Sequence, residues 1–198
     1  VVGIALAAFV AVYTGMLLMA AENVPLWNTP LLPVLFSVSA FDTGVALVEL
    51  VAVLASKKDP LAPKARTLME RIVVVLVLLE GVVMAAFLAS MLGGDAQTAI
   101  GATAASSASL LVSGGLAVCF WGMVVACGLA LPLVMAVAGL VLHGRAKKKP
   151  GAGQHGSGVL MAIGAAGALV GGCELRFLIL AAGVHADVVA ETVRGLIG

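Results

Sequence analysis

The chain has 198 residues, of which 62% are hydrophobic and only 11% are charged, with a formal net charge of +1. Soluble domains carry about 25% charged residues, so this composition excludes a water-soluble domain. The apolar residues also run together instead of alternating with polar ones, which excludes an outer-membrane barrel.

Five apolar stretches follow one another along the sequence, and each is long enough to cross the roughly 30 Å hydrocarbon core of a bilayer as a helix. They predict an all-α fold, a polytopic transmembrane helix bundle of about five spans within a single integral-membrane domain, 1–198. The expected spans are 1–20, 31–56, 67–92, 110–143 and 158–183.

Three further features of the sequence carry expectations. The first apolar run begins at Val1 with no charged segment before it, so we expect an N-terminally truncated chain that lacks earlier helices. Between the third and fourth spans, 93–109 is too polar to cross a membrane and suits a short interfacial helix. Pro132 is expected to kink the fourth span, because proline lacks the backbone N–H that a helix uses.

Basic residues cluster in two loops and predict the orientation. Five of the eleven lysines and arginines lie in 57–71 and four more in 143–149, whereas the loops 21–30 and 93–109 contain none. By the positive-inside rule, the basic loops 57–66 and 143–155 are cytoplasmic. Orientation is a sufficient explanation for these clusters, so we expect no nucleic-acid partner.

Four carboxylates interrupt the apolar spans: Asp42, Glu49, Glu80 and Glu174, with Arg176 close to the last. Each such charge costs roughly 2.5–3.5 kcal/mol at the bilayer centre, and intramembrane acids usually serve proton relays, ion pathways or polar ligand sites. Ordered by depth together with Tyr13 and Glu70, these groups form a ladder that suits proton transfer. Glu174, Arg176 and Tyr13 are outermost, and the inner groups follow in the order Glu80 and Asp42, Glu49, Glu70. The alternative is a set of buried ion pairs that hold the helices in register, although one arginine cannot neutralise four acids.

Other polar residues restrict the chemistry. Tyr13 is the only tyrosine and lies deeper in its span than an amphipathic ring at the interface, the alternative explanation, would need. A phenol at this depth can hydrogen-bond a polar head group, such as a quinone carbonyl. The three histidines all lie at span ends or in loops, so we expect no haem, which needs axial ligands inside the helices. The three cysteines form no CxxC pair, so we expect no iron–sulfur cluster or other metal bound by this protein. Gly167 and Gly171 form a GxxxG pattern, which predicts a close helix–helix contact.

Two blocks of sequence resemble the membrane subunit of the NrfD/polysulfide reductase family. The first is YTGMLLMAAENVPLWNTPLLPVLFSVSAFDTGVALVEL, with its YTG-x-LL, P-x-W-N and L-P-x-L-F-x-x-S patterns. The second is GCELRFLILAAGVHAD, which is similar to the last helix of that family. The resemblance covers most of the sequence and corresponds to the C-terminal part of a member.

The resemblance implies a function. Family members are inner-membrane subunits that exchange electrons between menaquinone or ubiquinone and an iron–sulfur, ferredoxin-like partner subunit. A molybdopterin or multihaem cytochrome subunit often completes the complex, and some members are thought to couple the reaction to proton movement.

The resemblance also implies roles for particular residues. Tyr13 matches the tyrosine that faces the quinone, and Trp27 and Asn28 lie in the loop expected to face the quinone head group and the partner. Asp42, Glu80 and Arg176 fall where a proton path is expected. Two alternatives remain open from the residues themselves: a proton-coupled secondary transporter and a purely structural membrane anchor.

Overall fold

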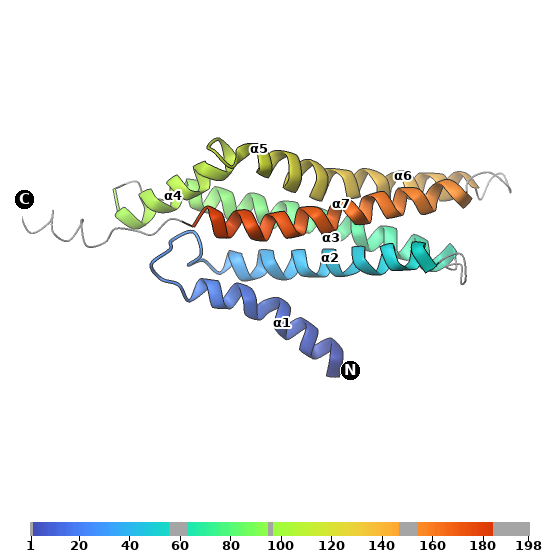
Figure 1. Cartoon of the computed structure of the whole chain (residues 1–198), viewed down its shortest axis with the longest axis horizontal. Helices are drawn as coiled ribbons and strands as arrows, with labels where there is room; N and C mark the ends of the chain where they lie inside the picture. Colours follow the sequence, from blue (N-terminus) through green and yellow to red (C-terminus); the bar gives the residue numbers. More distant parts are fainter. Residues whose placement is uncertain (1, 56–62, 95–96, 147–153, 184–198) are drawn as a thin grey trace, which may run out of the picture. The chain divides into compact units, whose positions relative to one another are not determined.

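The computed structural model describes residues 2–55, 63–94, 97–146 and 154–183, and every regular element within these ranges is helical (Figure 1). The all-α prediction is therefore confirmed for the described part of the protein. The elements are α1 (Val2–Met19), α2 (Leu31–Ala55), α3 (Pro63–Leu92), α4 (Ala99–Val112), α5 (Ala117–Cys119), the π-helix η1 (Phe120–Ala130), α6 (Leu131–Ala146) and α7 (Gln154–Ala181).

Within the described ranges, four helical stretches are long and apolar enough to cross a membrane, which confirms a multi-pass membrane protein. They are Leu31–Ala55, Lys64–Leu92, Ala117–Val141 and Gly158–Ala181. The remaining expected span, 1–20, corresponds to α1. Its part Phe9–Met19 is apolar but shorter than the four stretches above. At about 1.5 Å per residue, the 18 residues of α1 reach about 27 Å, slightly less than a typical hydrocarbon core.

The fourth span begins at Ala117 instead of the expected residue 110, because residues 110–112 form the last turn of α4. Thr98 caps the start of α4 by accepting a hydrogen bond from the N–H of Gly101 at 3.1 Å. At its other end, the N–H groups of Ser113 and Gly114 both donate to the carbonyl of Ser109. Glycine commonly follows a helix end in this way, so the predicted short helix exists but ends only where the glycines begin.

A π-helix of 11 residues, η1, occupies the middle of this span, and the sequence did not reveal it. The wider π pattern ends at Ala130, and α-helical geometry resumes at Leu131, immediately before the buried Pro132. A change of helix type therefore lies beside Pro132, and the expected kink at this residue stays a prediction. π-helical turns are frequent at functional sites.

The protein forms two compact units. The described residues of unit 1 lie within 1–37, 82–120 and 175–198, and those of unit 2 lie within 38–81 and 121–174. The predicted GxxxG contact lies in unit 2 and is confirmed. A β-carbon at Gly171 would collide with the Cα of Gly128, and one at Gly167 would lie 2.6 Å from the carbonyl oxygen of Cys127. The missing side chains thus let α7 approach η1 closely.

The two basic loops lie partly outside the described residues. Of the predicted cytoplasmic loops, 57–62 in the first and 147–153 in the second are not described, and the side of the membrane that they face stays a prediction.

Candidate functional site

Three of the predicted acids lie on the buried faces of α2 and α3. Asp42 is 2% exposed, Glu49 is 4% exposed and Glu80 is 4% exposed. On α2 the buried positions Ser39, Asp42, Ala46 and Glu49 recur every three or four residues, which places them on one face of the helix. The acids therefore face protein, as intramembrane ionisable groups usually do, while residues such as Leu47 and Val51 are exposed.

A fourth buried acid, Glu70 on α3, extends this set and is only 3% exposed. Glu80 lies close enough to Asp42 for their charges to interact. Glu49 lies close enough to interact with the charges of Glu70 and of Asp42. The four carboxyls therefore form a connected row in the order Glu80, Asp42, Glu49 and Glu70, in which the two acids of α2 lie between the two acids of α3. We call it the carboxyl row.

From the sequence, Glu70 is expected at the inner end of the ladder but not among the site residues, because it lies near the edge of its span. A signal for it existed. Glu49 lies six residues before the end of α2 and Glu70 lies seven residues after the start of α3, so consecutive antiparallel helices bring them to the same depth. The spacing Glu70, Val73, Val77, Glu80 also marks one continuous helix face, and all four residues are buried.

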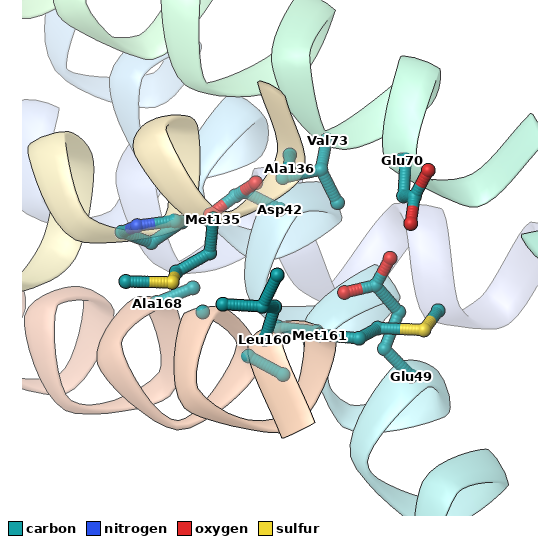
Figure 2. A pocket seen from close by; sticks show the side chains of 13 residues that line it. Asp42, Glu49, Glu70, Val73, Met135, Ala136, Leu160, Met161 and Ala168 are labelled. Atoms are coloured by element: carbon teal, nitrogen blue, oxygen red, sulfur yellow. The ribbon is translucent and has the colours of Figure 1, made fainter. Parts of the chain in front are cut away.

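A cavity in unit 2 opens beside three members of the carboxyl row (Figure 2). Figure 2 shows the carboxyl groups of Glu49 and Glu70 directed toward each other, with Asp42 farther along the same cavity. The space available to the centre of a water-sized sphere is about 10 Å³. The lining comes from α2, α3, α6 and α7: Asp42, Ala46, Glu49, Glu70, Val73, Pro132, Met135, Ala136, Leu160, Met161, Gly164, Ala165 and Ala168.

Two oxygen atoms in this cavity lack hydrogen-bond partners within the described part of the protein: Oδ1 of Asp42 and Oε1 of Glu49. Buried polar atoms are nearly always hydrogen-bonded to protein or to ordered water, because an unpaired one costs about 1–3 kcal/mol. These two atoms are therefore available to a small polar ligand.

Gly139 on α6 makes room for Glu70. A β-carbon at this position would collide with Oε1 of Glu70 and lie 2.8 Å from the Cδ of the same carboxyl group. Gly139 is itself buried, so the carboxyl group occupies the space that a side chain would fill. The glycine thus positions Glu70 beside the cavity.

Trp27 anchors the loop between α1 and α2 to the end of α7, within unit 1. Its indole N–H donates to the carbonyl oxygen of Ile179 at 2.9 Å, and its ring lies against Gly183. The carbonyl of Ile179 is one of the last in α7, where helix carbonyls lack partners within the helix. Asn28, next to Trp27, is exposed.

Arg176 and Glu174 do not line the cavity beside the carboxyl row. The guanidinium of Arg176 lies over the ring of Phe36, 5.8 Å from its centroid, and Phe36 is buried. Such a cation–π contact stabilises a partly desolvated cation. Glu174 is half-buried on α7.

Tyr13 lies on the outside of α1, with 52% of its surface exposed. Its ring stacks on that of Phe9 with centroids 5.9 Å apart, and the neighbouring Met16 and Leu17 are exposed as well. The phenol therefore belongs to an apolar, accessible surface, far more open than the buried carboxyl row.

Within the described residues, no group of three histidine, cysteine, aspartate or glutamate side chains could hold a metal ion. Cys119 and Cys173 are exposed and Cys127 is half-buried, and all three are free thiols. The groups that sequence and structure single out for polar chemistry are therefore carboxyls, the phenol and the arginine.

The apolar helices and the buried carboxyl row define a multi-pass helical membrane protein with ionisable groups in its interior. A sequence profile of the family "Polysulphide reductase, NrfD" matches residues 1–187. The protein belongs to this family.

Individual relatives agree with the profile. The sequence is 36% identical over 183 residues to the C chain of the polysulfide reductase of Wolinella succinogenes, an alignment that covers 92% of this protein and 52% of the relative. It is 31% identical over 179 residues to "Protein NrfD" of Escherichia coli, which covers 90% of this protein and 50% of that one. The sequence thus spans about half the length of these relatives. No solved structure matches it significantly.

Proposed function

We propose that this protein is a quinone-interacting membrane subunit of a respiratory oxidoreductase. In this role it passes electrons between menaquinone or ubiquinone and an iron–sulfur partner subunit, with a molybdopterin or multihaem cytochrome subunit completing the complex. The observation that carries the proposal is family membership over residues 1–187. The name of the Wolinella relative, one chain of a polysulfide reductase, supports a place in a multi-subunit reductase.

Quinol oxidation releases two electrons and two protons for each quinone formed. In the proposed complex the electrons go to the clusters of the partner subunit, because cofactors of that kind carry out one-electron chemistry. The protons need acceptors near the quinone and a route away from it. A phenol and buried carboxyls are suitable groups for both tasks.

Tyr13 is the proposed contact for the quinone head group, and Trp27 and Asn28 are assigned to the same site. The exposure of Tyr13 and its stacking on Phe9 support this assignment, because quinones diffuse within the lipid and reach a protein from its apolar surface. The phenol O–H can donate to a quinone carbonyl, and the aromatic rings can contact the flat quinone ring.

The test of this site removes one hydroxyl group. Tyr13→Phe is expected to lower the rate of quinol oxidation by the assembled complex at least several-fold, because it keeps the ring and deletes the donor. Thr14→Val is the matched control, since it deletes a hydroxyl one residue away that donates to the carbonyl of Val10. Equal rates in the wild-type and Tyr13→Phe complexes would rule out the role of Tyr13.

The carboxyl row is the proposed proton route, with Asp42, Glu49 and Glu80 as relay groups and Glu174 and Arg176 as further candidates. The burial of the row and the electrostatic proximity of its members support it. In proteoliposomes, Asp42→Asn and Glu80→Gln should reduce proton uptake or release during quinol turnover. Unchanged proton movement in both variants would leave the row with a structural role only.

The proposed location is the inner membrane, as a single integral-membrane domain with the basic loops on the cytoplasmic side. Co-purification discriminates the alternatives. An iron–sulfur protein that co-elutes with this protein is expected. A solitary protein that takes up a substrate against a proton gradient would instead favour a transporter.

A further inference from the structure

The cavity beside the carboxyl row meets the conditions for a buried water molecule. A cavity needs about 10–15 Å³ of space for a water centre and two to four polar partners before water occupies it. This one offers about 10 Å³ and is lined by three carboxyl groups, those of Asp42, Glu49 and Glu70. Two of their oxygen atoms, Oδ1 of Asp42 and Oε1 of Glu49, have no partner in the described part of the protein.

The spacing of the carboxyl row also favours such a molecule if protons are to pass along it. Asp42 and Glu49 are seven residues apart on α2, about 10 Å along the helix axis. The two side chains cover part of this distance. A direct hydrogen bond joins oxygens only about 2.5–3.0 Å apart, whereas one bridging water, with two such bonds, joins oxygens up to about 5–6 Å apart. Water can supply such a bridge, because it both donates and accepts.

We propose that this cavity binds an ordered water molecule, held by the carboxyls of Asp42, Glu49 and Glu70. The site itself is independent of the quinone chemistry. Its use as a proton bridge between Asp42 and the pair formed by Glu49 and Glu70 rests on the proposed function. A proton arriving at Asp42 then passes to the water, and the water releases another proton to Glu49 or Glu70, so no net charge accumulates on the water.

Unit 1 contains an internal control of nearly the same size. Its cavity also offers about 10 Å³, but its lining is wholly apolar: Leu35, Met84, Phe87, Leu88, Leu111, Phe120, Leu175, Leu178 and Ile179. Cavities lined only by apolar side chains stay dry. The two cavities therefore offer about the same space to the centre of a water molecule and differ in the chemistry of their walls.

Each cavity contains a buried methionine that can report on water. Met161 lines the cavity of the carboxyl row and is 5% exposed, and Met84 lines the apolar cavity and is 4% exposed. Methionine sulfur is readily oxidised to the sulfoxide. Hydroxyl radicals produced from water by a brief X-ray pulse react mainly beside the water that generates them, so a buried methionine is oxidised quickly only if water lies next to it.

The experiment is X-ray footprinting of the full-length protein in lipid nanodiscs, followed by mass spectrometry of the methionine peptides. Met161 should be oxidised several-fold faster than Met84, and a pulse in ¹⁸O-labelled water should place the label on Met161. Equal, slow oxidation of the two methionines would overturn the proposal. No variant and no quinone is needed for this comparison.

A cavity-filling variant sharpens the result. Ala165→Leu places a larger side chain in the cavity and should bring the oxidation rate of Met161 down to that of Met84. Ala108→Leu, at a buried position of α4 outside both cavities, is the control and should leave Met161 unchanged. If Met161 is labelled but Asp42→Asn leaves proton movement unchanged, the water site stands and the proposed proton route fails.

Discussion

The cavity of unit 1 and the cavity of unit 2 offer similar space to a water centre but differ in chemistry. The cavity of unit 1 is surrounded by leucine, isoleucine, methionine and phenylalanine side chains, whereas that of unit 2 has three carboxyls in its wall. Helix α3 contributes to both: Met84 and Phe87 face the first, and Glu70 and Val73 face the second. One regular helix face thus changes from polar to apolar along its length.

This difference shows where the protein needs stability and where it needs polar groups. In lipid, helices are held together by close packing because the surrounding chains are as apolar as the side chains. The apolar cavity belongs to that packing. Carboxyls in the second wall add nothing to it and cost free energy when desolvated, which favours a function for them over a structural role.

The largest change in stability is expected from a substitution that disrupts the packing around the apolar cavity. Phe87→Ala enlarges it beside a fully buried ring and should lower the free energy of unfolding by about 3–5 kcal/mol, as Phe→Ala truncations do in other cores. Thermal unfolding in detergent micelles measures it. Val75→Ala on the exposed face of α3 should change stability by less than about 0.5 kcal/mol. Equal losses for the two variants would show that the apolar cavity is not a packed core.

The next largest effect is expected when a carboxyl is added to the wall of the unit 1 cavity and one is removed from the wall of the unit 2 cavity. Met84→Glu puts a carboxyl into the apolar cavity, where no polar partner lines the wall, and should cost about 3 kcal/mol. Glu49→Met removes a carboxyl at nearly constant volume and should leave the unfolding midpoint unchanged or raise it, while proton movement declines. If Glu49→Met proved strongly destabilising, the carboxyl would have to be an integral part of the helix packing.

The smallest effect concerns two glycines of unit 2, Gly171 and Gly44. Gly171→Ala should lower the free energy of unfolding by about 1–3 kcal/mol, because the new methyl group meets the backbone of Gly128. Only a shift of one helix relative to the other can relieve this contact. Gly44→Ala on α2 has nothing within 4 Å of the new carbon. It should be neutral or slightly stabilising, since alanine favours a helix by about 1 kcal/mol over glycine. Similar melting curves for both variants would contradict the close contact of α7 and η1.

Much of this was predictable from local sequence. The composition implied a multi-pass helical protein, and the seven-residue spacing of Asp42 and Glu49 placed both on one face of one helix. The GxxxG pattern of Gly167 and Gly171 identified a close contact. Each of these depends on the period of a single helix, which the residues of that helix largely determine.

Other features depended on contacts between distant segments. Glu70 joins the row because α3 lies against α2 and because Gly139 on α6 leaves space for its carboxyl. The indole of Trp27 meets a carbonyl 152 residues away. The π-helical segment of Phe120–Ala130 departs from the α-helical period that apolar composition alone would suggest.

The sequence by itself determined that this protein lies in lipid and that several carboxyls fall within its apolar spans. A long apolar segment in lipid must pair all its backbone N–H and C=O groups, and a helix does so within the segment itself. The spans and the membrane location therefore follow from composition. Only the tertiary structure decided which carboxyls meet, which cavity they share and which one stays apolar. These depend on how separate helices pack, and one missing side chain, as at Gly139, is enough to decide where a carboxyl lies.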